Sequence, residues 1–192
     1  MRTKTPHDDG MTDEERLVVA EKYAAEVAAH FLPDVALMVL RSKRSLVCRC
    51  GLVDGHVELT LSAVSIRAKS RSGYGEYESV KKLLAVEFNR VSRDWPIVGV
   101  AAIKLIVLHE LAHAVNQSVN GLNPRPHGVE FCKTFSTMVR RYQDELKEDV
   151  AQEARRSQLR LRLKAGESGG TEGVRRSPLA MPAGRRSRDS EE

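Results

Sequence analysis

The sequence predicts an α+β fold in which a small antiparallel sheet packs on helices. Apolar residues recur at helical spacing near the N-terminus and again over 97–119, whereas those between Val35 and Leu61 follow the shorter period of strands. Hydrophobic residues make up 41% of the 192 residues and charged residues 30%, as in ordinary globular proteins. This length allows one domain flanked by tails.

The first helix is expected to begin after Thr12 and to end before Pro33. Thr12, with Glu15 three residues later, forms the sequence pattern of a capping box. The residues expected to face the core recur every three or four positions, namely Leu17, Ala20, Ala24, Val27 and Phe31. Residues 1–11 are expected to be disordered.

Three strands are expected between Val35 and Leu61. Two of them, over 35–40 and 46–48, flank a polar stretch, and a turn at 53–56 leads into the third. The third, Val57–Leu61, alternates apolar and polar residues as a half-exposed strand does. A loop rich in glycine and serine is expected at 70–75.

Three further helices are expected after the sheet. The first covers 78–91 and ends before Trp95-Pro96, and the second covers 97–119. Because the second is apolar around its circumference, it should be buried at the centre of the domain. Asn120-Gly121 is a suitable C-cap for it. The last helix is expected over 128–150, with a basic helical extension over 151–164 and a disordered basic tail over 165–192.

The net charge of +5 comes from the C-terminal end of the chain. Residues 1–153 hold 21 Lys and Arg against 21 Asp and Glu, whereas residues 154–188 hold ten basic residues and two acidic ones. Cationic charge alone is sufficient for binding phosphates, so the tail is a candidate for contacts with DNA. The arginines expected to make them are Arg155, Arg156, Arg160, Arg162, Arg175, Arg176, Arg185 and Arg186. A solvated tail without a partner is the alternative.

The apolar runs, the N-terminal residues and the cysteines predict an intracellular protein without a membrane partner. We also expect it to be a monomer. No apolar run is long enough to span a bilayer, and the first ten residues do not resemble a signal peptide. The three cysteines form no CxxC pair and are expected to be free thiols. We therefore expect a cytoplasmic protein, with association with the nucleoid if the tail binds DNA.

The expected buried helix carries the motif His109-Glu110-Leu111-Ala112-His113. Two histidines four residues apart on a helix are offset by about 40° and one turn, so both imidazoles can reach one cation. Glu110 borders the same site, where its carboxylate can take a proton from water and return it to a leaving amine. Zn²⁺, one ion per chain, is the metal that this motif predicts.

A third ligand is expected from the segment after the helix. His127 lies in Pro126-His127-Gly128, immediately before the next helix, and a proline-stiffened loop can bring it back toward the motif. Glu130 is the alternative, because some sites with this motif use two histidines and a carboxylate.

Two stretches together carry a resemblance to a known family. The run His109-Glu110-Leu111-Ala112-His113-Ala114, followed by His127-Gly128-Val129-Glu130-Phe131-Cys132-Lys133, resembles the HExxHA and HGxxF signature of the SprT-like zinc metalloprotease family. The resemblance covers about residues 12–148, and its second stretch is most similar to the Spartan branch, which acts on DNA–protein crosslinks. The cysteine-based zinc ribbon that ends many members is absent from this chain.

The resemblance implies a zincin-like metallopeptidase domain over 12–150, with the motif on its central helix. It implies that His109, His113 and His127 bind zinc and that Glu110 is the catalytic base. It also implies a cleft between the sheet and this helix, where an exposed strand, Val57–Leu61, pairs with an extended substrate. The residues considered for stabilising the oxyanion are Tyr74, Tyr77, Arg125 and Tyr142.

The expected function is that of a zinc endopeptidase acting on proteins associated with or crosslinked to DNA. One alternative is a non-catalytic zinc-binding module associated with nucleic acid, and another is a regulatory protease that cleaves a repressor. Glu110 favours an enzyme, because a structural zinc site needs no general base.

Overall fold

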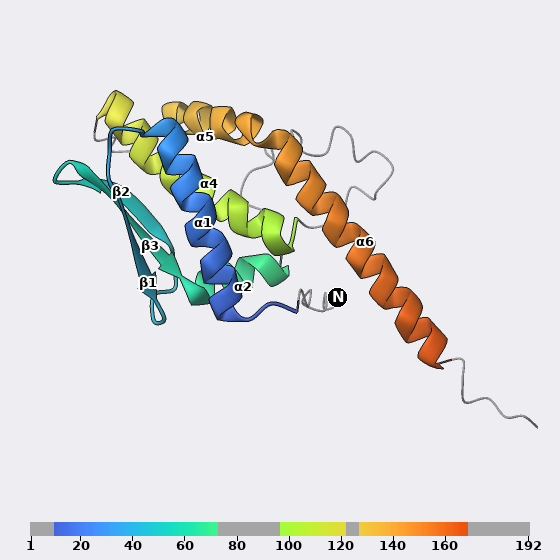
Figure 1. Ribbon diagram of the computed structural model, residues 1–192. Helices are drawn as coiled ribbons and strands as arrows, with labels where there is room; N and C mark the ends of the chain where they lie inside the picture. The colour runs from blue at the N-terminus through green and yellow to red at the C-terminus, as the bar shows by residue number, and fades with distance from the viewer. Residues whose placement is uncertain (1–9, 73–96, 122–126, 169–192) are drawn as a thin grey trace, which may run out of the picture. The chain divides into compact units, whose positions relative to one another are not determined.

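The computed structural model, which describes residues 10–72, 97–121 and 127–168, is a mixed α+β fold (Figure 1). Helices pack on one face of a small sheet, so the predicted α+β class is confirmed at this level. The chain divides into two units, residues 1–156 and 157–192. The sheet and the hydrophobic core belong to the first unit. The predicted helix over 78–91 and the predicted tail over 169–192 lie outside the described residues.

Helix α1, Asp13–Phe31, begins with the predicted capping box. The Glu15 amide donates to the Thr12 hydroxyl at 3.2 Å, and the Thr12 amide donates to the Glu15 carboxylate at 2.7 Å. Of the residues predicted to face the core, all but the half-buried Phe31 are buried. Met11, which was placed in the disordered N-terminus, packs against this core.

The sheet contains β1 (Leu37–Ser42), β2 (Arg49–Val53) and β3 (His56–Ser62) in the order β1-β3-β2. Strands β2 and β3 form the expected antiparallel hairpin, whose two-residue turn places Asp54 and Gly55 at φ values of 47° and 82°. Strand β1, however, pairs with β3 in parallel. The prediction of an antiparallel sheet is therefore wrong for this pair.

Strands β1 and β3 are parallel because β3 inserts between β1 and β2, which run in opposite directions. The segment 43–48 must cross the end of β3 to connect β1 with β2, and the buried Ser62 holds it there. The Ser62 hydroxyl donates to the Ser45 carbonyl, and its amide donates to the Cys48 thiol at 3.3 Å. The predicted strand over 46–48 is wrong, because these residues lie in the crossover.

Helix α2, Ala63–Ser72, follows β3 directly. Residues 70–72, which were predicted to begin a loop, are therefore helical, and residues 73–75 lie outside the described residues. Arg16 of α1 donates to the Ser70 hydroxyl at 3.1 Å, and both side chains are buried. This hydrogen bond joins α2 to α1 and explains how a helix with few apolar residues is held on the core.

Helix α4, Gly99–Asn120, is the predicted central helix. It contacts α1, α2, β2 and β3, together with the next described helix, α5 (Val129–Arg141). Among the described residues it is the one helix long and apolar enough to cross a membrane, but 78% of its most apolar stretch is buried inside the protein, as in a core helix. Gly121, at a φ of 73°, closes α4 as predicted, and its amide donates to the Gln117 carbonyl at 2.9 Å.

The first turn of α4 is held by a carboxylate from helix α6, Gln143–Ser168. The N-cap residue Val98 makes no side-chain hydrogen bond, and the buried Glu153 lies against Gly99. A Cβ at position 99 would stand 3.0 Å from the Glu153 carboxylate, and Gly99 has a φ of 63°. Glycine is therefore required, and a carboxylate at a helix N-terminus is stabilising.

The predicted helix over 128–150 is two helices, α5 (Val129–Arg141) and α6, which meet at Tyr142. The break carries no glycine or proline, and both helices pack on the core through buried residues, Phe131 and Met138 of α5 and Leu146 of α6. The predicted helical extension over 151–164 lies within α6. Residues 165–168, predicted to be disordered, are also helical.

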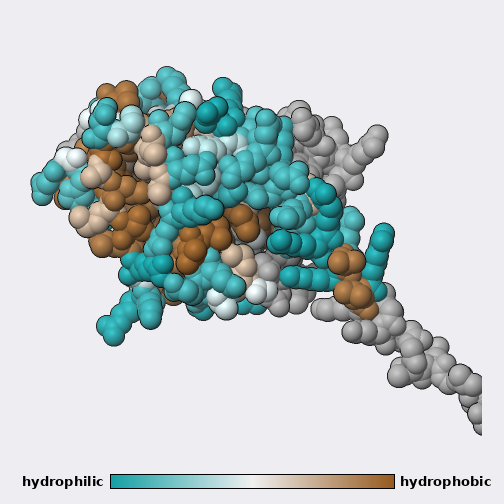
Figure 2. Space-filling view, viewed as in Figure 1, coloured by the Kyte–Doolittle hydropathy of each residue, from teal (hydrophilic) through white to brown (hydrophobic). Residues whose placement is uncertain are grey.

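Apolar side chains are exposed over the sheet, as the brown atoms at the left of Figure 2 show. They come from β1, from the crossover and from the end of β2, and are Met38, Leu40, Leu46, Val47 and Val53. The side of the sheet that faces the helices is buried through Val57, Leu59 and Leu61. One face of the sheet is thus covered by helices, and the other face exposes apolar side chains.

Candidate metal centre

Helix α4 places His109 and His113 one turn apart on the same side, as the motif predicts. Their ring centroids are 5.1 Å apart. His109 is buried and His113 is half-buried, because the residues around them face the core. The pair therefore lies at the boundary between the core and solvent.

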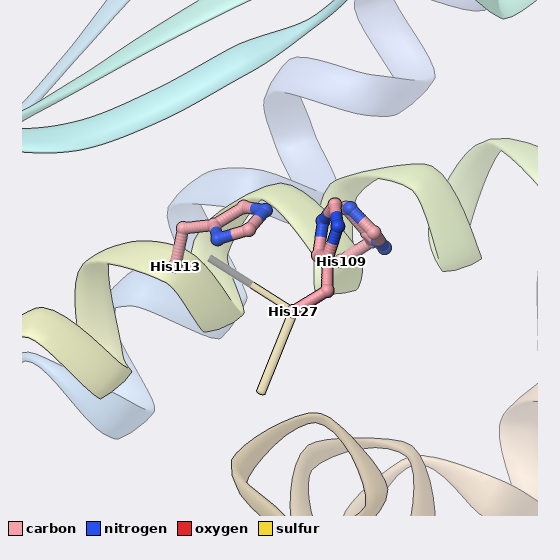
Figure 3. Close-up of side chains that lie close together, drawn as sticks. All are labelled: His109, His113 and His127. Atoms are coloured by element: carbon pink, nitrogen blue, oxygen red, sulfur yellow. The ribbon is translucent and has the colours of Figure 1, made fainter. Parts of the chain in front are cut away.

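His127 joins this pair from the segment immediately before α5. Its ring centroid lies 5.2 Å from that of His109 and 5.0 Å from that of His113, and Figure 3 shows the three rings converging. One ligand atom from each histidine lies within 4.8 Å of the other two, so the group could hold a metal ion. The prediction that these three histidines come together is confirmed.

Glu130, the alternative third ligand, lies outside this group. Its side chain is exposed on the first turn of α5 and pairs with Lys133 at 2.9 Å. His127 is therefore the better third ligand, as expected.

Phe131 of α5 packs against all three histidines. It stacks on His113 at a centroid distance of 4.4 Å and meets His109 and His127 edge-on at 5.2 Å and 5.0 Å. Because this ring is fully buried, it cannot move without disturbing the core. Phe131 therefore restricts the orientation of the imidazoles and couples α5 to the histidines of α4.

Burial keeps the two histidines of α4 neutral at physiological pH. It lowers the pKa of His109 to about 3, helped by the neighbouring His113 and His127, and it lowers the pKa of His113 to about 4, helped by His127. A metal ion needs neutral imidazoles, because protons compete for the same nitrogen atoms. Three imidazoles form a donor set that suits zinc.

Glu110 is half-buried, and its charge acts on strand β2. Burial, together with the nearby Glu110 carboxylate, raises the pKa of Cys50 to about 12 and that of Cys48 to about 11. Both thiols are therefore protonated at neutral pH and poor metal ligands in this state. Glu110 lies about two helical turns before Gln117, whose amide binds Leu52 of β2, so both residues are on the side of α4 that faces this strand.

The charge of Lys69 also reaches the centre. This residue of α2 contributes to the lowered pKa of His109. It was not among the residues considered for stabilising the oxyanion, because nothing in the sequence links α2 to the motif. Of those that were, Tyr74, Tyr77 and Arg125 lie outside the described residues. Tyr142 is buried, with its ring 5.4 Å from that of Tyr23.

The strand predicted to pair with a substrate is not an edge strand. Val57–Leu61 belongs to β3, which lies between β1 and β2 and has no free edge. Strand β2 is the edge strand that contacts α4. A substrate strand beside the histidines would therefore have to pair with β2.

The arginines predicted to bind DNA divide into three groups. Arg155 and Arg156 are exposed on α6 and lie near Glu148 and Glu153, at 3.1 Å and 3.8 Å. Arg160 and Arg162 lie farther along α6, in the second unit. The others, Arg175, Arg176, Arg185 and Arg186, lie outside the described residues.

Comparison with known proteins does not assign the chain to a family. No family model matches it, and neither a curated protein nor a solved structure matches it. What supports a function is therefore the motif and the geometry of the centre.

The metal-free protein should lose stability as the pH falls from 7 toward 4. Histidines in the unfolded chain titrate near 6.5, whereas burial holds the pKa of His109 near 3 and that of His113 near 4. The unfolded state therefore binds more protons in this window. The free energy of unfolding should fall by at most about 1.4 kcal/mol per pH unit for each histidine.

Urea unfolding of the metal-free protein and of its His109→Gln variant at several pH values would measure this loss. The variant should show the shallower dependence on pH, since it lacks one of the two groups. Equal slopes in the two proteins would contradict the proposed burial of a neutral His109.

Proposed function

We propose that this protein is a zinc-dependent endopeptidase of the SprT-like type. The observation that carries the proposal is the convergence of His109, His113 and His127 beside Glu110. Within the part of the chain that the structure describes, this group offers three protein ligands, which leaves a coordination position for water or substrate. Structural zinc sites usually fill all four positions with protein side chains.

In this proposal the three histidines hold the metal, and Glu110 moves the proton. When bound, zinc acts as a Lewis acid that makes water nucleophilic at neutral pH and polarises the scissile carbonyl. Glu110, adjacent to His109, takes the proton from the attacking water and delivers it to the leaving amine nitrogen. Phe131 keeps the imidazoles oriented during both steps.

The substrate in this proposal is an extended polypeptide that pairs with the outer edge of β2. This strand contacts α4, and Glu110 acts electrostatically on Cys50 of the strand and on Cys48, which just precedes it. A peptide paired there would have its main chain fixed by backbone hydrogen bonds, whatever its sequence. An endopeptidase that accepts many protein substrates would use this kind of recognition.

We also propose that the basic end of the chain holds the protein on DNA, so that its substrates are proteins associated with or crosslinked to DNA. Helix α6 carries Arg156, Arg160 and Arg162 in its second half, where Arg156 and Arg162 are exposed and Arg160 is half-buried. Cationic side chains on a helix bind phosphates without reading the base sequence. The alternative is a zinc-binding module that binds DNA but cleaves nothing.

Glu110→Gln should retain zinc and lose proteolysis. The amide keeps the shape of the side chain but cannot accept the proton, so kcat/KM for an unstructured protein substrate should fall at least about 100-fold. The measurement is metal content together with cleavage rate, and His113→Ala, which should lose the metal, is the control. Full activity in Glu110→Gln would refute the proposed mechanism, and a wild type that holds zinc without cleaving would support the alternative.

Arg160→Gln combined with Arg162→Gln should reduce the salt dependence of DNA binding. If both arginines contact duplex phosphates, the slope of log K against log salt should become shallower by about 1.8. The matched control combines Arg155→Gln with Arg156→Gln and should have a smaller effect, since these arginines have acidic neighbours. An unchanged slope in the first variant would exclude the proposed contacts.

A further inference from the structure

A side chain of α4 already occupies part of the outer edge of β2. The Gln117 amide oxygen accepts from the Leu52 backbone N–H at 3.1 Å, and its nitrogen donates to the Leu52 carbonyl at 3.4 Å. Gln117 thus satisfies both backbone groups of one strand residue, as a neighbouring strand would. Its amide also stands over Gly51, where an added Cβ would be 3.9 Å from the amide oxygen.

The register of the hairpin shows which other groups share this edge. In a two-residue hairpin the residues flanking the turn exchange backbone hydrogen bonds, and pairs then alternate between bonded and non-bonded. Val53 and His56 flank the turn, so Leu52 and Cys50 stand in non-bonded pairs with β3. The N–H and C=O groups of Cys50 therefore point to the same outer edge as those of Leu52.

The two edge positions lie at different places along α4. Cys50 lies against Ala114 and within reach of the charge of Glu110, whereas Leu52 is bound to Gln117, one turn beyond His113. Strand β2 therefore runs in the same direction as α4 beside the metal centre. A peptide pairing antiparallel with β2 would pass from Leu52 toward Cys50, with its amino-terminal side at Leu52.

We propose that Gln117 is a specificity-determining residue that ends the peptide-binding edge of β2. This inference rests on the proposed function. A substrate backbone can pair with Cys50, but its next pairing position on the amino-terminal side, at Leu52, is taken by the Gln117 amide. Residues on that side of the substrate gain no backbone hydrogen bonds, so the enzyme recognises only a short stretch before the scissile bond.

The test measures how affinity depends on peptide length in the zinc-loaded full-length protein. Fluorescent peptides of one sequence, extended stepwise at their amino-terminal end, are titrated into Glu110→Gln, which should not cleave them, and into the same protein carrying Gln117→Ala. The first protein should reach a constant Kd with the shortest peptides. Gln117→Ala frees the Leu52 N–H and C=O groups, so the affinity of the second protein for longer peptides should improve about tenfold, as expected for two hydrogen bonds.

Two further variants separate this role from a purely structural one. Gln117→Glu keeps the acceptor for the Leu52 N–H but cannot donate to its carbonyl, so its gain should be smaller, about threefold. Ser118→Ala, on the exposed side of α4, should bind like the parent protein. A structural role would instead make every peptide bind more weakly to Gln117→Ala, regardless of length.

The outcomes distinguish the inference from the proposed function. Identical length dependence with and without Gln117 would overturn the inference, as would a failure of every variant to bind any of the peptides. Binding with the expected length dependence in Glu110→Gln, combined with no cleavage by the zinc-loaded wild type, would sustain the role of Gln117 and refute the peptidase.

Discussion

The packing of Phe131 against three imidazoles is the interaction on which the candidate metal centre depends. His109 and His113 share a helix, and local geometry alone places them together. His127 comes from a different segment, immediately before α5. The packing of Phe131 of α5 against α4 brings His127 within reach of His109 and His113. A buried aromatic ring thus sets the position of three imidazoles at the boundary between the core and solvent.

The central helix imposes a second constraint, because it must be buried and still present polar groups at the site. Glu153 stabilises its first turn, and Gly121 ends it after the motif. Between these ends, one side of the helix carries the histidines, and Glu110 and Gln117 lie toward β2. The same helix therefore holds two of the proposed metal ligands, the proposed base and the amide that occupies the strand edge.

Sequence patterns were sufficient to predict the features that depend on residue spacing within one helix. The capping box at Thr12, the burial of α4 and the pairing of His109 with His113 all follow from residue spacing along one element. The parallel pairing of β1 with β3 could not be predicted, because apolar and polar residues alternate in the same way in parallel and antiparallel strands. The crossover that connects β1 with β2 also depends on the buried Ser62, which no pattern singles out. For the same reason β3 was wrongly predicted to be the exposed strand, whereas β2 is the edge strand beside α4. No sequence pattern indicated the hydrogen bonds between Gln117 and Leu52.

We propose that three imidazoles, and no thiol, bind the metal, although Cys50 lies on the neighbouring strand, Cys48 just precedes that strand and Cys132 lies in α5. X-ray absorption at the zinc edge, on protein loaded with one equivalent of the metal, tests this claim most directly. If the three histidines hold the metal, the spectrum should show nitrogen and oxygen ligands only, at about 2.0–2.1 Å, with the scattering pattern of three imidazoles. A sulfur ligand at about 2.3 Å, or a spectrum with fewer imidazoles, would contradict it.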